Sequence, residues 1–255
     1  MKPIWIIAKN TFREIIRDRI LYGIVVFALL LFGLSLALGQ LSYAEQARIS
    51  ADFGFAGIQL GASILAVFIG STLVAREIEK QTVLTLLARP VSRTQFLLGK
   101  FFGLSLVVAT VIAGLAAVLA GLLVLLELKI GGAFFIALAG VMLEALLLIA
   151  IALFFGSFSR PTMTVVFTAS FYLIGHWISS LGFLLEKNSS PGFKFLAEVL
   201  ANAVPDLEKF NWRSAPIYDL AVSSHEIFGS VAYAFGWVLL LLALTSFIFR
   251  RRDFV

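Results

Sequence analysis

The placement of charged residues constrains this chain more than any other feature. Its 20 basic and 15 acidic residues leave six long segments that contain one formal charge between them, Glu144. Each segment is longer than the roughly 20 residues that a helix needs to cross about 30 Å of hydrocarbon. Charged residues make up only 14% of the chain, whereas a soluble domain has about 25% of them. Apolar residues make up 60%, against about 45–50% in a soluble domain. The chain is therefore predicted to be an integral membrane protein.

The uncharged segments predict helices rather than barrel strands. Barrel strands alternate apolar and polar side chains over about ten residues, and the run VVATVIAGLAAVLAGLLVLL (107–126) does not alternate. Helices satisfy their own backbone hydrogen bonds, as lipid requires. We predict an all-α integral membrane protein with one transmembrane domain over 1–255. Its six spans are expected at about 20–42, 54–75, 99–126, 132–157, 162–185 and 228–249.

Basic residues set the orientation of these spans. If the N-terminus is cytoplasmic, both termini and the loops after the second and fourth spans are cytoplasmic, and 14 of the 20 Lys and Arg residues lie there. Cytoplasmic loops carry the excess of Lys and Arg. We therefore predict a multi-pass protein with both termini in the cytoplasm. The net charge of +5 is an orientation signal, and no nucleic-acid partner is expected.

Residues 3–19 predict an amphipathic helix at the membrane interface. Trp5 and Phe12 lie on its apolar stripe, and Lys9, Arg13 and Arg17 form a cationic stripe. Such helices lie in the interface with their cationic side chains toward anionic headgroups. The helix is a topology anchor, a working part of the protein, or both.

The predicted cytoplasmic loop 76–98 exposes apolar side chains. Leu84 and Leu87 belong to a short apolar helix face, and Pro90 ends that helix. Ser92 and Gln95 have the spacing of a capping box at the start of the third span. An apolar patch in such a loop indicates a protein partner. The alternative is a charged loop that only sets topology.

The predicted extracytoplasmic loop 186–226 is the longest polar segment. An amphipathic stretch predicts a short helix on the outer membrane surface, and a compact turn rich in proline and aromatic residues follows it. The turn caps the exit of a pathway, docks an external partner, or is simply packed structure. Its candidate residues are Pro205, Phe210, Asn211 and Arg213.

The sequence shows no set of residues for catalysis. His176 and His225 are the only histidines, and neither stands in a nucleophile motif or at metal-ligand spacing. The absence of cysteine excludes disulfides and thiolate metal sites. A phosphate-binding loop is also missing, because Thr94 stands where the first glycine before Gly99 and Lys100 would be. We predict a protein that is not an enzyme and has no metal or cofactor of its own.

Glu144 is the one charge inside a predicted span. A carboxylate near the bilayer centre costs about 2.5–3.5 kcal/mol on insertion scales, and it usually faces protein or water. It is a polar point on a substrate pathway or a helix–helix clamp; the alternative is a protonated carboxyl paired with a neighbouring Ser or His. His176 is interpreted as a hydrogen-bonded packing residue, with a pathway or clamp role as the alternative.

Two motifs are shared with a known family. The first lies within 52–103 and consists of an acidic "E-x-E" stretch, a Thr, a short Leu-rich helix and a "P-V-S-R … L-L-G-K" tail. The second is PDLEKFNWR at 205–213. They resemble the permease subunits of type-2 ABC exporters. They are most similar to the branch that contains the permease for maturation of nitrous oxide reductase, a multicopper enzyme. Asp206 stands where that branch usually has Asn.

The resemblance implies an elbow helix at 3–19 and a coupling helix at about 78–89 that docks into a separate ATP-binding subunit. That subunit would bind ATP and Mg. The resemblance also implies a dimer with a second permease subunit, identical or different. The copper-linked role does not transfer, because the chain has three Met, two His and no Cys. The candidate ATPase-coupling residues are Glu77, Glu79, Thr82, Leu84, Leu87, Arg89, Pro90 and Arg93.

The leading prediction is a non-catalytic permease subunit that couples ATP hydrolysis by its partner to export or extraction of a substrate. One alternative is a proton-coupled secondary transporter that uses Glu144. The two halves of the chain show no obvious repeat, which many secondary transporters have. The other alternative is a membrane scaffold whose 186–226 loop recruits an extracytoplasmic accessory protein.

Overall fold

The computed structural model describes residues 2–17, 19–39, 45–79, 92–127, 130–187, 191–218 and 220–251. All regular structure in these residues is helical. The elements are α1 (Lys2–Ile16), α2 (Arg19–Gly39), α3 (Gln46–Glu79), α5 (Arg93–Leu125), α6 (Gly132–Gly156), α7 (Pro161–Lys187), α8 (Pro191–Ala203), the 3₁₀ turn η1 (Glu208–Phe210), α9 (Ser214–Tyr218) and α10 (Ser224–Arg251).

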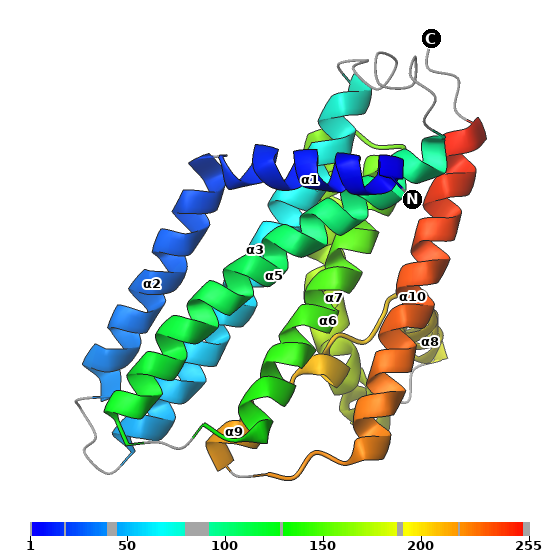
Figure 1. The fold of residues 1–255 in the computed structure, drawn as a ribbon. Coiled ribbons are helices and arrows are strands. Elements are labelled where there is room, and N and C mark those ends of the chain that lie inside the picture. The colour runs from blue at the N-terminus through cyan, green and yellow to red at the C-terminus, as the bar shows by residue number, and fades with distance from the viewer. Residues whose placement is uncertain are drawn as a thin grey trace.

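The long helices form one bundle around α6 (Figure 1). Helices α3, α5, α7 and α10 all contact α6, and every side chain from Leu147 to Leu153 is at most 1% exposed. A helix that is apolar on all sides is stable only when other apolar groups, of protein or lipid, surround it. The core of the bundle therefore lies around α6, which also carries Glu144.

Four helices in the described part of the chain are long and apolar enough to cross a membrane. They lie within α3, α5, α6 and α10. In α2 the apolar part is the shorter segment Leu21–Leu34, and α7 contains several Thr and Ser residues and His176, which lower its hydropathy. The predicted all-helical membrane architecture is confirmed, while the count of six spans stays a prediction.

Helix α1 lies across one end of the bundle and packs on α5 (Figure 1). Two glycines on α5 make this approach possible. A Cβ atom on Gly99 would lie 2.6 Å from Cβ of Ile7, and one on Gly103 would lie 2.6 Å from Cβ of Thr11. Because neither glycine has a side chain, the two helix backbones approach each other closely.

Helix α5 begins at the predicted capping box. The Ser92 hydroxyl accepts a hydrogen bond from the backbone N–H of Gln95 at 3.2 Å, and the Gln95 side chain accepts one from the backbone N–H of Ser92 at 3.1 Å. The prediction from the spacing is confirmed. Helix α3 continues to Glu79, and most of the predicted coupling helix, residues 80–89, lies outside the described residues.

Candidate functional site

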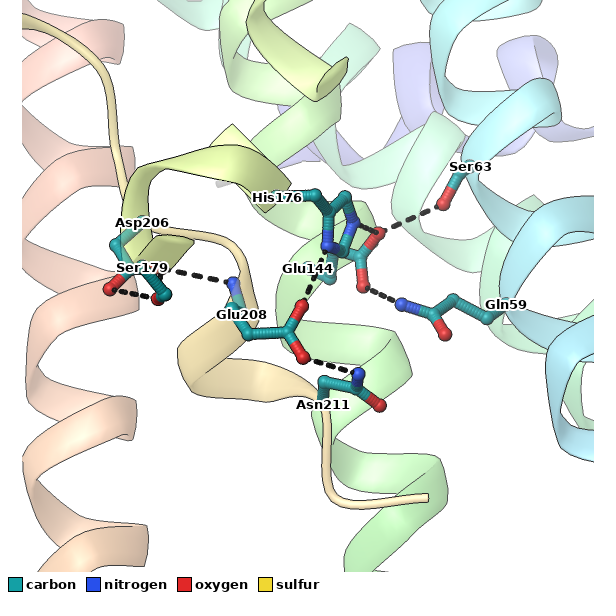
Figure 2. Close-up of polar contacts among 8 residues, drawn as sticks. All are labelled: Gln59, Ser63, Glu144, His176, Ser179, Asp206, Glu208 and Asn211. Carbon is teal, nitrogen blue, oxygen red and sulfur yellow. Dashed lines mark hydrogen bonds and ion pairs between the residues drawn. The ribbon is translucent and has the colours of Figure 1, made fainter. Parts of the chain in front are cut away.

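Glu144 lies in the centre of the bundle with 1% of its surface exposed. Helix α3 supplies two donors to its carboxyl group (Figure 2). The Gln59 side-chain amide donates to Oε2 at 2.8 Å, and the Ser63 hydroxyl donates to Oε1 at 3.0 Å. A buried carboxylate is tolerated when such donors replace its water. These bonds fix α6 against α3.

His176 on α7 links Glu144 to a second acid. Its Nε2 atom lies 3.2 Å from Oε1 of Glu144, and its Nδ1 atom lies 3.2 Å from Oε2 of Glu208. The other oxygen of Glu208 accepts from the Asn211 side chain at 2.7 Å. Figure 2 shows the imidazole between the two carboxyl groups. We call Glu144, His176 and Glu208 the acid–imidazole cluster.

The contacts of His176 indicate how many hydrogens the acid–imidazole cluster shares. Each contact between a ring nitrogen and a carboxyl oxygen needs one hydrogen between the two atoms. A protonated imidazole between two carboxylates supplies both hydrogens, and so does a neutral imidazole with one protonated carboxyl group. Both arrangements carry a net charge of −1. With these two shared hydrogens alone, the cluster is negative in either arrangement.

The segment 205–213 folds back against α6 and α7. The Leu207 backbone N–H donates to the Gly175 carbonyl oxygen at 3.1 Å, and Leu207 and Phe210 are at most 1% exposed. A Cβ atom on Gly140 would collide with the Phe210 carbonyl oxygen, and one on Gly175 would lie 2.8 Å from the Pro205 carbonyl oxygen. Glycines on both helices thus make room for the backbone that carries Glu208.

Asp206 holds the start of this segment. Its side chain accepts from the Ser179 hydroxyl at 3.1 Å and from the Glu208 backbone N–H at 3.1 Å. Its own backbone N–H donates to the Tyr233 hydroxyl at 2.9 Å, and Lys209 Nζ lies 4.4 Å from the centre of the Tyr233 ring. These contacts on both sides orient Glu208 toward His176.

A polar cavity of about 270 Å³ lies beside the acid–imidazole cluster. Arg213 lines it, and its Nε atom lies 3.7 Å from an oxygen of Asp52 on α3. The full lining is Ala56, Gln59, Leu60, Tyr172, His176, Glu208, Asn211 and Arg213. Among the described residues, no group of three or more His, Cys, Asp or Glu side chains is placed to hold a metal ion.

The structure brings together candidate residues that lie far apart in the sequence. Glu144 and His176 are in contact, Asn211 bonds to Glu208, and Arg213 faces the same cavity. Pro205 and Phe210 are buried. Four further residues of the site were not predicted from the sequence: Gln59, Ser63, Tyr172 and Glu208. A glutamine inside an apolar run and a glutamate inside the shared 205–213 motif are the signals that could have found two of them.

The predicted elbow residues Trp5, Lys9, Phe12 and Arg13 lie on α1, and Arg17 directly follows it. Ala8 and Ile15 are buried against the bundle, whereas Trp5 is 62% exposed. Phe12 is partly buried, and Lys9, Arg13 and Arg17 are exposed. The cationic stripe of the helix therefore faces away from the protein.

The predicted coupling residues lie at the same end of the bundle as α1 where the structure describes them. Glu77 and Glu79 are in the last turn of α3. Arg93 starts α5, and its guanidinium donates to the carbonyl oxygens of Phe249 at 2.7 Å and Arg250 at 3.1 Å. The remaining coupling residues, Thr82, Leu84, Leu87, Arg89 and Pro90, lie outside the described residues.

These helices define a multi-pass helical membrane protein. A family model described as "ABC-2 family transporter protein" matches residues 5–254. The chain therefore belongs to the ABC-2 family of transporter proteins. The family is a membrane component of transport and generally non-catalytic, and it implies an ATP-binding partner subunit and a lipid bilayer. No curated protein matches the chain.

Proposed function

We propose that this protein is the non-catalytic permease subunit of an ABC exporter, coupled to a separate ATPase subunit that binds ATP and Mg. The observation that carries the proposal is the match of an ABC-2 family model to nearly the whole chain. The arrangement of the bundle supports it. The end of α3, the start of α5, the crossing helix α1 and the end of α10 meet at one end (Figure 1).

Helix α3 is the proposed mechanical link between the ATPase and the acid–imidazole cluster. It runs as one helix from Gln46 to Glu79 and carries both donors to Glu144. At 1.5 Å per residue, Ser63 and Glu79 lie about 24 Å apart along it. A push at the ATPase end would therefore move Gln59 and Ser63 relative to α6. ATP drives such a shift only if it favours one of the two states.

The coupling residues have specific proposed roles. Glu77 and Glu79 pair with basic residues of the ATPase, Leu84 and Leu87 fill its groove, and Arg89 and Arg93 fix the loop. The bonds from Arg93 to the end of α10 support the last of these roles, because cations bind well to the free carbonyl groups of a helix C-terminus.

Co-purification of the ATPase tests the proposal. We expect Glu77→Lys combined with Leu87→Asp to abolish ATPase binding while membrane insertion stays normal. The matched control is Glu45→Lys, which reverses a charge before α3 begins, at the other end of that helix. If the ATPase still co-purifies with the double variant at the wild-type level, the proposed coupling surface is wrong.

Several finer features belong to the same proposal. The permease acts as a dimer, with a second copy or a different permease, in a bacterial or archaeal cytoplasmic membrane. Both termini are cytoplasmic, which the 14 basic residues on that side support. The coupling and 205–213 motifs support placement in the branch of the nitrous oxide reductase maturation permease. Its copper-linked role is not part of the proposal.

A second candidate function is proton-coupled transport. The acid–imidazole cluster forms a continuous chain of hydrogen bonds from the polar cavity to the buried Glu144, as a proton relay requires. Transport in vesicles without ATP that stops when the proton gradient collapses would favour it. Undiminished transport by Glu144→Gln would exclude it.

A further inference from the structure

A second cavity continues from the polar one along the groove between α3 and α7. It has a volume of about 170 Å³ and shares Leu60 and Tyr172 with the polar cavity. Its other lining residues are Ser63, Ile64, Val67, Phe68, Ala169 and Leu173. The two cavities together offer a polar compartment and an apolar compartment, joined at Tyr172.

The polar compartment carries excess negative charge. The acid–imidazole cluster has a net charge of −1 because of its two shared hydrogens. Arg213 does not cancel this charge, since it is offset by Asp52 at 3.7 Å. The remaining charges of the folded-back segment, Asp206 and Lys209, are of opposite sign and both contact Tyr233 on α10. A positive group is thus the ligand charge that this compartment favours.

Tyr172 is a second feature that favours a ligand with a positive group. Its ring centre lies 4.7 Å from that of His176, and the residue lines both compartments. An aromatic ring attracts a cation over its face, most strongly where water is excluded. A ligand with its positive head near Glu208 would pass this ring and place its tail among the apolar side chains of α3 and α7.

We infer that the α3–α7 groove binds a cationic amphiphile, a molecule with an ammonium or guanidinium head and an apolar tail. This inference rests on the proposed function, for which it names the substrate class. The head binds at Glu208 and Tyr172, and the tail packs on Ile64, Phe68 and Leu173. Each methylene group of the tail that leaves water contributes about 0.8 kcal/mol, so head and tail both contribute to affinity.

The test is saturable binding of radiolabelled decyltrimethylammonium to the purified full-length permease in nanodiscs, without the ATPase. We expect Glu208→Gln to weaken binding about tenfold or more, because the head loses its carboxylate partner. This variant keeps an acceptor for Asn211, and size-exclusion chromatography checks its folding. Tetramethylammonium, the head without the tail, is expected to bind at least about tenfold more weakly than the full amphiphile.

Two controls separate this site from nonspecific partition. Glu226→Gln removes the same charge from the exposed first turn of α10, and it should change affinity by less than about twofold because salt screens exposed charges. Ile64→Trp narrows the apolar compartment and should weaken binding of decyltrimethylammonium. Equal binding by wild type and Glu208→Gln, or binding of decyl sulfate as tight as that of the cation, would overturn the inference. So would a lack of saturable binding.

This test and the test of the proposed function fail separately. Cation binding is measured on the permease alone, whereas the coupling proposal is measured by ATPase co-purification. If the ATPase co-purifies and the cation does not bind, only the ligand class is wrong. If the cation binds and no ATPase co-purifies, the groove is a binding site in a protein with another function.

Discussion

Two regions of the bundle, one at its α1 end and one near its centre, are held together in different ways. Where α1 crosses α5, the helices pack closely over Gly99 and Gly103, and one ion pair joins Lys100 to Glu14 at 3.8 Å. Where α3, α6, α7 and the 205–213 segment meet, directional hydrogen bonds join three acids, a histidine and two hydroxyl groups. Packed surfaces tolerate small sliding movements, whereas a hydrogen-bonded buried network is satisfied only in particular geometries. The difference favours small sliding movements in the proposed coupling region and discrete states at the acid–imidazole cluster.

The largest effect is expected from breaking the acid–imidazole cluster. Glu144→Leu leaves the donors of Gln59 and Ser63 without an acceptor and His176 with one carboxyl partner. Removing one partner from a buried charged pair costs about 3–5 kcal/mol of folding free energy. The measurement is reversible unfolding in detergent. Glu144→Gln keeps an acceptor and should cost clearly less, so equal losses for the two variants would contradict the network.

A smaller loss is expected where the 205–213 segment approaches α6. In Gly140→Ala the new methyl group meets the Phe210 carbonyl oxygen, so the segment must shift, at a cost of about 1–3 kcal/mol. The fluorescence of Trp212, which is 6% exposed, should report the shift.

The matched control for this glycine is Gly114→Ala. Nothing lies within 4 Å of a Cβ atom there, so the substitution should stabilise the helix, by up to about 1 kcal/mol. If both alanine variants were more stable than wild type, the segment would not be seated against α6.

The smallest effect is expected at the start of α5, in the proposed coupling region. Ser92→Ala removes the side-chain acceptor of the α5 capping box, which typically costs about 1 kcal/mol. Ser92→Asp keeps an acceptor and should be close to wild type. Thermal unfolding of the three proteins measures both effects. A loss from Ser92→Ala as large as that from Glu144→Leu would remove the proposed contrast between the two regions.

The sequence predicted local features better than distant contacts, for a physical reason. The capping box at Ser92 and Gln95 depends on a three-residue spacing, which a sequence shows directly. The contact between Glu144 and His176 joins residues 32 positions apart and depends on how α6 packs against α7. No single-chain pattern encodes that packing, so the two residues appeared as isolated polar positions.

The sequence pattern also did not predict that the 205–213 segment folds back into the bundle. Its prolines and aromatic residues predicted a compact turn, and the turn exists. Its burial depends on Gly140 and Gly175, which lie on other helices and accept its backbone at close range. Glycines are common in membrane helices, so these two carried no distinct signal. Glu208 was therefore missed.

Helix α3 is proposed to transmit ATPase closure to the groove beside the acid–imidazole cluster. The most direct measurement places spin labels at Leu60 and Leu173, on the two walls of that groove, in the complex with its ATPase. We predict that ATP changes the distance distribution between the labels and that Glu77→Lys with Leu87→Asp abolishes the change. Identical distributions with and without ATP, in a complex that hydrolyses ATP, would show that α3 does not transmit ATPase closure to the groove.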